Sequence, residues 1–283
     1  MGRTGSFHEV ADGVFVRRHA SLDLNCGLVV GDGACLVVDT RSDLGEAADL
    51  IAAVRRVTPH PWTVVDTHAH YDHCFGNAAF RPATVWGSRG CAADLRATGE
   101  VQRAARVAEL LADGDAEAAE RVRRVPLDPP DALVDDTAVL DVGGREVVLR
   151  HLGRGHTAHD LVVEVETPGD RTVLFAGDLV EEGAPPAFDD AFPAEWPATL
   201  GRLHALARGP VVPGHGAVVD ADFVGAQRAE LLAVLAAVRA GRLADGPYDA
   251  ATMRLASSRV PPCACEGRGG RGPSTVGAGR PFT

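Results

Sequence analysis

Short runs of apolar, mostly β-branched residues recur in the first part of the chain, and each run is bounded by Gly, Asp or Pro. This pattern is typical of buried strands, and the runs are too short for helices. It predicts strands at residues 14–16, 27–30, 35–38 and 62–65.

A helix is predicted between the third and the fourth of these strands. The side chain of Asp43 is suited to cap its N-terminus, and the helical spacing of apolar residues continues toward Val57. The apolar positions along it are Leu44, Ala47, Leu50, Ile51 and Val54.

The second half of the chain repeats the alternation of strands and helices. Strands are predicted at residues 138–140, 146–149, 161–165 and 172–175, and helices at 194–207 and 222–240. Two strand-rich halves, each followed by helices, favour an α/β (α+β) architecture of two sheets packed face to face with helices outside. In that arrangement each half contributes side chains to one shared edge.

Two segments have a different composition. Residues 89–124 are rich in Ala, Glu and Arg, with apolar residues at helical spacing, and predict one or two surface helices. Residues 257–283 are rich in Pro, Gly, Ser and Arg and poor in apolar residues, so we expect a disordered tail. No linker interrupts residues 1–256, which are therefore expected to form one domain.

Composition excludes several classes of partner. The chain has 283 residues, no lysine and a formal net charge of −11, which disfavours nucleic acid and anionic membranes as partners. No long apolar segment indicates a signal peptide or a membrane span, so a cytoplasmic protein is expected. The six cysteines are expected to be reduced, and Cys263 and Cys265 are too few to complete a zinc site alone.

One segment carries most of the candidate chemistry, directly after the strand predicted at 62–65. It holds four side chains that can bind a metal: His68, His70, Asp72 and His73. In an extended or tightly turned segment, His68 and His70 point the same way and can chelate one ion, whereas Asp72 and His73 are turned toward a second. The alternative is a set of surface histidines without a ligand, which this density at the end of a strand disfavours.

Three further candidates each follow a glycine at the end of an apolar run. They are His156, Asp178 and His215, which occur in Gly-His-Thr, Gly-Asp and Gly-His-Gly. Glycine allows close approach of the backbone and unusual dihedral angles, which suits loops that aim one ligand into a cleft. Any one of them alone is more typical of a turn, but their order and shared position favour ligands.

The series His-x-His-x-Asp-His, Gly-His-Thr, Gly-Asp and Gly-His-Gly resembles the ligand series of the metallo-β-lactamase superfamily, over roughly residues 8–240. The resemblance implies a four-layer αββα sandwich. It also implies that His68, His70 and His156 hold a first metal. Asp72, His73 and His215 would hold a second, and Asp178 would bridge the two.

The chemistry of such a centre predicts hydrolysis. Two divalent ions held by neutral imidazoles and few carboxylates can lower the pKa of a bound water from about 15.7 to about 7. We therefore expect a metal-bridging hydroxide that cleaves an ester, lactone, thioester or amide-type bond of a small molecule. Asp72 is the predicted catalytic residue, because it can orient the nucleophile. The nitrogen and oxygen donors fit two Zn²⁺ per chain best, and Fe or Mn would be tolerated.

The superfamily leaves several functions open. β-Lactamases of the commonest subclass carry cysteine where this chain has Asp178, and they often bind the drug with a lysine that is lacking here. Hydroxyacylglutathione hydrolase and homoserine-lactone lactonases share the ligands, although the former has an added helical domain. Residues 73–80 look most like bacterial hydrolases of the superfamily. The principal alternative is a mononuclear iron enzyme similar to persulfide dioxygenases; a non-catalytic binding protein would be expected to lack a ligand.

Several neighbours are candidates for orienting the ligands. Proteins that resemble this chain use an acid at the position of Asp39 to hold the histidine segment, although a plain turn aspartate is the alternative. Asp66, His159 and Asp160 are weaker candidates for the same role. Cys74 follows His73 directly and is expected to be a buried thiol that faces away from the metal.

Substrate selectivity is expected to come from residues 89–124, which can arch over the cleft as a helical lid. Its arginines offer forked donors to a substrate carboxylate. They are Arg103, Arg106, Arg121, Arg123 and Arg124. The alternative is a solvated helix whose arginines pair with Glu109, Glu117 and Glu120.

Overall fold

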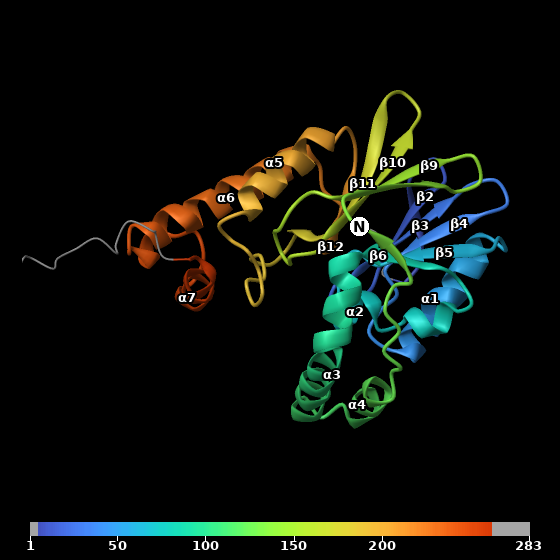
Figure 1. Ribbon diagram of the computed structural model, residues 1–283, viewed down its shortest axis with the longest axis horizontal. Coiled ribbons are helices and arrows are strands. Elements are labelled where there is room, and N and C mark those ends of the chain that lie inside the picture. Colours follow the sequence, from blue (N-terminus) through green and yellow to red (C-terminus); the bar gives the residue numbers. More distant parts are fainter. Residues whose placement is uncertain (1–4, 262–283) are drawn as a thin grey trace, which may run out of the picture.

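The computed structural model describes residues 5–261, which fold around two β-sheets (Figure 1). The first sheet has seven strands in the order β1-β2-β3-β4-β5-β6-β7. These strands are β1 (His8–Ala11), β2 (Val14–Arg18), β3 (Asn25–Val30), β4 (Cys35–Val38), β5 (Trp62–Val65), β6 (Val85–Ser88) and β7 (Ala132–Val134). The strands from β4 to β7 run parallel to one another, so their carboxyl ends meet at one edge.

The second sheet has five strands in the order β12-β11-β10-β9-β8. They are β8 (Thr137–Asp141), β9 (Glu146–His151), β10 (Leu161–Thr167), β11 (Arg171–Glu181) and β12 (Val211–His215). Every strand predicted from hydrophobic runs is present in one sheet or the other. The additional short strands β1 and β7 end the first sheet on either side.

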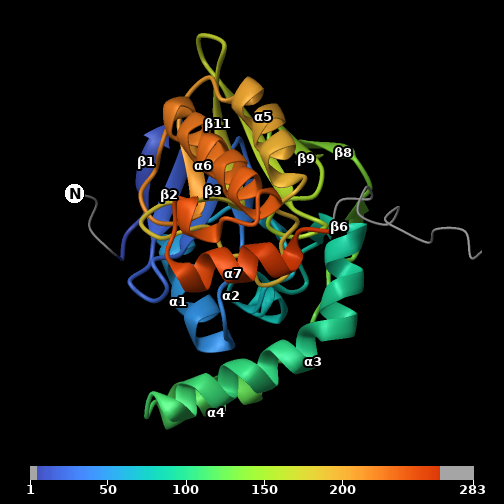
Figure 2. The same ribbon diagram turned by 90° about the vertical axis from the view of Figure 1, so that its left-hand side faces the viewer.

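Helices cover the outer faces of both sheets (Figure 2). The helices of residues 5–261 are α1 (Leu44–Val57), α2 (Tyr71–Cys74), α3 (Arg89–Ala112), α4 (Ala116–Arg123), α5 (Trp196–Leu206), α6 (Ala221–Arg239) and α7 (Ala250–Arg259), with 3-10 turns η1 (Asn77–Phe80) and η2 (Leu243–Asp245), and the outer faces are covered by α1 on the first sheet and by α5, α6 and α7 on the second. None of the helices among residues 5–261 combines the length and the apolar character needed to cross a membrane. The helices predicted at 43–57, 89–124, 194–207 and 222–240 are confirmed.

Three apolar layers hold the sheets and helices together. Val29 and Phe175 belong to a core between the two sheets, whereas their neighbours Leu28 and Leu174 belong to outer cores. Adjacent strand residues point to opposite faces, so each sheet buries both of its faces. Leu28 packs in the cluster that contains α1, and Leu174 packs in the cluster that contains α5, α6 and α7. The result is the four-layer αββα sandwich expected from the sequence.

The ends of two helices show where the sequence pattern succeeds and fails. Asp43 caps α1 as predicted, because its Oδ1 accepts hydrogen bonds from Gly45 N at 2.7 Å and Glu46 N at 2.9 Å. Helix α7 was not expected, and it buries Met253 and Ala256. It continues to Arg259, so the prediction of disorder is wrong for residues 257–259. The rest of the predicted tail from residue 262 onward, with Cys263 and Cys265, lies outside the described residues.

Helices α3 and α4 project from the sandwich as an arm beside α1 (Figures 1 and 2). The N-terminus of α3 is capped by Ser88, whose Oγ accepts a hydrogen bond from Cys91 N at 2.9 Å. Residues near this end are buried, whereas the far half of α3 is largely exposed. The arm therefore begins at the sheet edge that carries the candidate ligands.

Candidate metal centre

The seven predicted ligands come from four segments that meet at one edge of the sandwich. His68 and His70 lie in the loop after β5, and Asp72 and His73 lie in α2, which follows at once. His156 lies in the loop between β9 and β10. Asp178 lies near the end of β11 and His215 ends β12. Because these strands end at the same edge, residues from both halves of the chain face one another there.

The glycines beside the candidate ligands have steric roles. A Cβ atom on Gly214 would lie 1.7 Å from Oδ1 of Asp178, so only glycine leaves room for this carboxylate. Gly177 has a φ of +52°, and a Cβ there would lie 2.9 Å from the side chain of Thr67. Both positions support the interpretation that glycine brings backbone and ligand close together.

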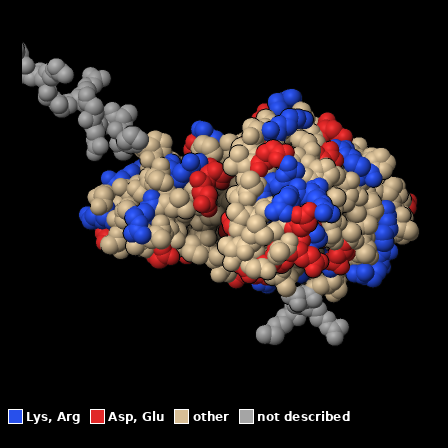
Figure 3. Space-filling model, turned by 90° about the horizontal axis from the view of Figure 1, so that it is seen from below, with Lys and Arg blue, Asp and Glu red and all other residues tan. Residues whose placement is uncertain are grey.

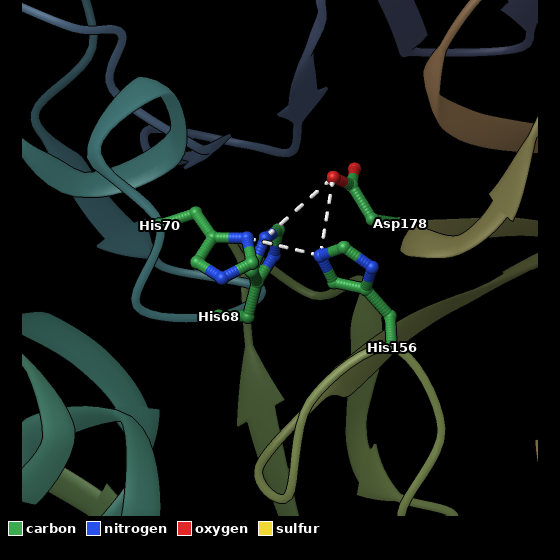
Figure 4. A group of neighbouring side chains, drawn as sticks. All are labelled: His68, His70, His156 and Asp178. Atoms are coloured by element: carbon green, nitrogen blue, oxygen red, sulfur yellow. Dashed lines mark hydrogen bonds and ion pairs between the residues drawn. The ribbon is translucent and has the colours of Figure 1, made fainter. Parts of the chain in front are cut away.

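One group of candidate ligands consists of His68, His70, His156 and Asp178, whose ligand atoms all lie within 4.8 Å of one another. Figure 4 shows the three imidazoles and the carboxylate converging on a common point. Oδ2 of Asp178 lies 3.7 Å from Nε2 of His68 and 3.5 Å from Nε2 of His156. Nδ1 of His70 faces Nε2 of His156 at 2.9 Å.

The other group consists of Asp72, His73 and His215, which meet the same 4.8 Å limit. Nε2 of His215 lies 3.4 Å from Oδ2 of Asp72 and 3.3 Å from Oδ2 of Asp178. Nε2 of His73 lies 3.7 Å from Asp72 and 3.3 Å from Oδ1 of Asp178. Asp178 therefore contacts side chains of both groups, as a bridging carboxylate must.

Most of the imidazoles are held by the nitrogen that points away from the centre. Nδ1 of His73 lies 2.8 Å from Oδ2 of Asp39. Nδ1 of His68 lies 3.1 Å from Oγ1 of Thr67, and Nδ1 of His215 lies 2.7 Å from the carbonyl oxygen of Leu22. Such contacts fix the tautomer, so that the inward nitrogen presents a lone pair.

Three inward atoms are buried and have no hydrogen-bond partner within the described residues: Nε2 of His68, Nε2 of His73 and Oδ1 of Asp178. Buried polar atoms are almost always satisfied. Lone pairs of imidazole and carboxylate that face one another without a proton donor need a cation between them. The donor set therefore fits metal ions, and its nitrogen and oxygen atoms suit zinc, iron or manganese.

Charge explains the pKa values in the metal-free protein. Burial lowers the pKa of His215, but the carboxylates of Asp178 and Asp72 outweigh it and raise this pKa to about 10. Burial also opposes protonation of His73, yet the same two carboxylates and Asp39 hold its pKa well above the usual range. Burial lowers the pKa of His68 and His156. The centre thus stabilises positive charge on its carboxylate side.

Asp39 makes the contacts that the orienting role implied by the resemblance requires. Its buried carboxylate accepts hydrogen bonds from Thr67 N at 2.8 Å and Thr67 Oγ1 at 2.9 Å, and it contacts His73. It thereby joins the end of β4 to the loop that carries His68. Its φ of +63° is a left-handed conformation that Asp and Asn tolerate better than most residues.

The weaker candidates do not touch the ligands. Asp66 accepts a hydrogen bond from Asn77 at 2.7 Å and lies behind the histidine loop. Asp160 accepts hydrogen bonds from Thr157 N and Oγ1, so it shapes the loop beside His156. His159 contacts Thr157 in the same loop. Cys74 is a buried thiol as predicted, and burial raises its pKa well above the usual range.

Two acidic residues near the centre were missed by the sequence analysis. Oδ2 of Asp190 lies 3.2 Å from Nε2 of His70, so it holds the outward nitrogen of that ring. Oε1 of Glu181 lies 3.7 Å from Nδ1 of His156. Burial and the charge of Asp178 raise the pKa of Glu181 to about 8. Glu181 is the last residue of β11, and Asp190 lies in the irregular loop that follows, where no periodic pattern indicates which side chains point inward.

The centre opens into a cavity of about 880 Å³. One wall is α3, which contributes Asp94, Thr98, Gln102 and Arg106 among others, and the role of this segment as a lid that sets selectivity stays a prediction. The arginines of residues 89–124 pair with acidic side chains, and the pairs with Glu109, Glu117 and Glu120 are those that the alternative interpretation predicted. Arg106 pairs with Glu109, Arg121 with Glu117 and Asp43, and both Arg123 and Arg124 with Glu120. Arg103 pairs with Glu100.

Known proteins resemble the chain over most of this structure. The family model described as metallo-beta-lactamase superfamily matches residues 22–215. A metallo-beta-lactamase from Pontibacter korlensis is 19% identical, with a TM-score of 0.62 over 80% of this chain and 98% of that chain. The metallo-beta-lactamase FIM-1 from Pseudomonas aeruginosa, in its mono-zinc form, is 18% identical, with a TM-score of 0.57 over 81% and 96%. No curated protein sequence matches the chain.

Proposed function

The chain belongs to the metallo-beta-lactamase superfamily, and from this premise we propose that it is a hydrolase that uses two divalent metal ions, zinc being the best fit. The family and the fold agree with the expectation drawn from the ligand motifs. The structural relatives are too distant in sequence to supply a substrate. The proposal therefore depends on the geometry of the centre.

The observation that carries the proposal is the environment of His73. Its Nδ1 is held by Asp39, so its buried Nε2 presents a lone pair toward the carboxylates of Asp72 and Asp178. In a metal-free protein this arrangement needs a proton to be stable, which is why the pKa of His73 is raised. A divalent ion satisfies the same three atoms without a proton.

Each part of the ligand set then has a role in hydrolysis. When bound, a pair of divalent ions supplies a water of lowered pKa and polarises the oxygen of the scissile bond. Asp72 lines the cavity and is only 7% exposed, so its carboxylate can accept a hydrogen bond from the attacking water and orient it. Asp178 contacts His156 of the first ligand group and His73 of the second, so its carboxylate fixes the distance between the two groups.

The second ligand group supports two metals over one. Asp72, His73 and His215 form a group of their own beside Asp178, and His215 is anchored by the carbonyl oxygen of Leu22. A mononuclear iron oxygenase, the principal alternative, has no need of this group. The substrates proposed are small molecules with an ester, lactone, thioester or amide-type bond, which a cavity of about 880 Å³ accommodates.

The test uses full-length protein stripped with a chelator and reloaded with Zn²⁺ or Fe²⁺. We expect Zn²⁺ to restore hydrolysis of at least one member of a panel of esters, lactones, thioesters and β-lactams. Asp178→Ala should lower that rate by orders of magnitude, because the carboxylate shared by both groups is lost. Asp222→Ala, at an exposed position in α6, serves as the matched control and should leave the rate unchanged.

The same protein is then tested for oxygen consumption with glutathione persulfide. Oxygen uptake that depends on Fe²⁺, without hydrolysis in the zinc form, would replace the hydrolase by the dioxygenase. Near-normal hydrolysis by Asp178→Ala would contradict the role assigned to that carboxylate.

A further inference from the structure

The face of α3 that lines the cavity carries a row of polar side chains at helical spacing. Asp94, Thr98 and Gln102 follow one another at intervals of four positions, so they lie side by side on one face of the helix. Oγ1 of Thr98 lies 3.3 Å from Oδ2 of Asp94 and accepts a hydrogen bond from Nε2 of Gln102 at 2.9 Å. These three side chains form a continuous hydrogen-bonded row along the cavity wall, which we call the α3 row.

One end of the α3 row holds the segment that carries two ligands. Nε2 of Gln102 donates a further hydrogen bond to the carbonyl oxygen of Ala69 at 3.1 Å. Ala69 is fully buried and stands between His68 and His70. A carbonyl oxygen can only accept a hydrogen bond, so the nitrogen of the Gln102 amide must face it. Gln102 thereby fixes the backbone between two ligands of the first group.

The other end of the α3 row holds the loop that carries His156. Oδ2 of Asp94 lies 3.5 Å from Nε2 of His159, which is buried. Ser88, the N-cap of α3, donates a hydrogen bond from Oγ to the carbonyl oxygen of His159 at 2.8 Å. Nδ1 of His159 lies 3.1 Å from Oγ1 of Thr157, the residue after His156. Helix α3 is therefore tied to both loops that supply the three imidazoles of the first group.

The second ligand group is held by other elements. His73 is held by Asp39 at the end of β4, and His215 is held by the carbonyl oxygen of Leu22 in the loop before β3. Within residues 5–261, no hydrogen bond or ion pair joins α3 to Asp72, His73 or His215. A change in the α3 row should therefore affect the first ligand group and spare the second.

The charged side chains of the arm are occupied with one another. Figure 3 looks at the end of the molecule where α3 and α4 lie in Figure 1, and it shows basic and acidic side chains interspersed. Arg103 pairs with Glu100 and Arg106 with Glu109, three positions apart in each case. These pairs are internal to the helix, whereas the α3 row makes its contacts with the ligand loops.

We propose, building on the metal-dependent hydrolase function above, that the α3 row positions the ligands of the first metal, with Gln102 as its principal positioning residue. The row holds two loops at the separation at which three imidazoles can share one ion. Side chains behind the ligands commonly set the affinity of a metal site in this way. Because the α3 row also lines the cavity, the segment expected to govern substrate selectivity also governs the affinity of the first metal.

The test replaces Gln102 by Met, which keeps the length and helix propensity of the side chain but removes the amide. Full-length protein loaded with the NMR-active isotope of cadmium should give one resonance per site, and the resonance that His215→Ala loses belongs to the second site. In Gln102→Met the resonance of the first site should shift or broaden, while the resonance of the second site stays in place.

A chelator competition measures the same effect as an affinity. In the His215→Ala background, the zinc dissociation constant reports the first site alone. Adding Gln102→Met should raise this constant about 3- to 10-fold, which corresponds to the loss of about one hydrogen bond.

Two variants serve as controls. Arg96→Met places the same side chain at an exposed position of α3 that does not line the cavity, and it should leave both resonances unchanged. Thr98→Val removes the hydroxyl that joins Asp94 to Gln102 and should shift the first resonance less than Gln102→Met does. Melting temperatures establish that each variant is folded.

The outcomes separate the α3 row from the hydrolase function. Unchanged resonances and an unchanged dissociation constant of the first site in Gln102→Met overturn the positioning role, whatever the activity of the protein. Equal shifts of both resonances also overturn it, because they indicate a general loss of rigidity. A selective effect on the first site, in a protein that hydrolyses no ester, lactone, thioester or β-lactam, supports the positioning role and overturns the hydrolase function.

Discussion

Replacing Asp39 by Asn tests how the centre is held in place. Asp39 accepts hydrogen bonds from Thr67 N and Thr67 Oγ1 and contacts Nδ1 of His73 at 2.8 Å. Asn keeps one oxygen that accepts from Thr67 N. Its NH2 group, however, replaces the oxygen that faces His73, so that two hydrogen-bond donors, this NH2 and the N–H of His73, face each other. The substitution therefore removes the contact that fixes the tautomer of His73 and leaves the size of the side chain unchanged.

The expected loss follows from similar contacts in other metal sites. Removal of a carboxylate that orients a ligand imidazole typically weakens metal binding by about 10–100-fold, or about 1.4–2.7 kcal/mol. The loss of affinity should affect mainly the metal that His73 holds, because His73 does not belong to the first ligand group. The backbone should tolerate the change, since Asn adopts the φ of +63° at this position as readily as Asp does.

Competition with a coloured zinc chelator measures the dissociation constant of each site, and circular dichroism follows thermal unfolding. Asp170→Asn is a matched control, because Asp170 also has a positive φ of +57° and its side chain is 91% exposed in a distant turn. Loss of an orienting contact should weaken zinc binding at least about tenfold. If both zinc dissociation constants of Asp39→Asn stay within about threefold of the wild-type values, the role given to this carboxylate is therefore refuted.

Three further changes test other parts of the centre. Asp190→Ala should weaken the first metal, by about 10-fold in a chelator competition, because His70 loses the partner of its outward nitrogen; unchanged affinity would mean that the contact is incidental. Gly214→Ala should lower metal content and melting temperature together, because its Cβ would lie 1.7 Å from Oδ1 of Asp178; a fully loaded, equally stable variant would show that the carboxylate moves freely. His215 has a pKa of about 10 in the metal-free protein, so it is protonated at neutral pH and zinc must displace that proton. Zinc affinity should therefore fall as the pH is lowered from 10, and calorimetry in buffers of different ionisation enthalpy should detect the released proton; a pH-independent affinity would contradict this.

The parts of the structure that follow from local pattern were predictable. Asp43 caps α1 because its side chain can reach the free N–H groups of the first turn, and this depends only on nearby residues. The ligands were recognised because each follows an apolar strand, often after a glycine. The glutamates three or four positions from Arg106, Arg121, Arg123 and Arg124 also made the surface pairs predictable.

The remaining features depend on contacts between distant segments. Asp190 meets His70 across 120 positions in the chain, and its loop has no periodicity that would indicate its direction. Glu181 continues an apolar strand, so its burial beside His156 depends on where the loop between β9 and β10 lies. Helix α7 was missed because its buried face consists of only Met253 and Ala256. Strand β1 was missed because its sequence His-Glu-Val-Ala forms no apolar run, and β7 has only three residues.

The central claim is that the chain holds two metals, and elemental analysis tests it most directly. Full-length protein purified without added metal should contain two equivalents of metal per chain, predominantly zinc, and His215→Ala should contain about one, because the second ligand group loses an imidazole. His204→Ala is the matched control, since His204 lies on α5 outside both ligand groups, and it should retain the wild-type content. One equivalent of iron in the wild type, or an unchanged metal content in His215→Ala, would contradict the dinuclear centre.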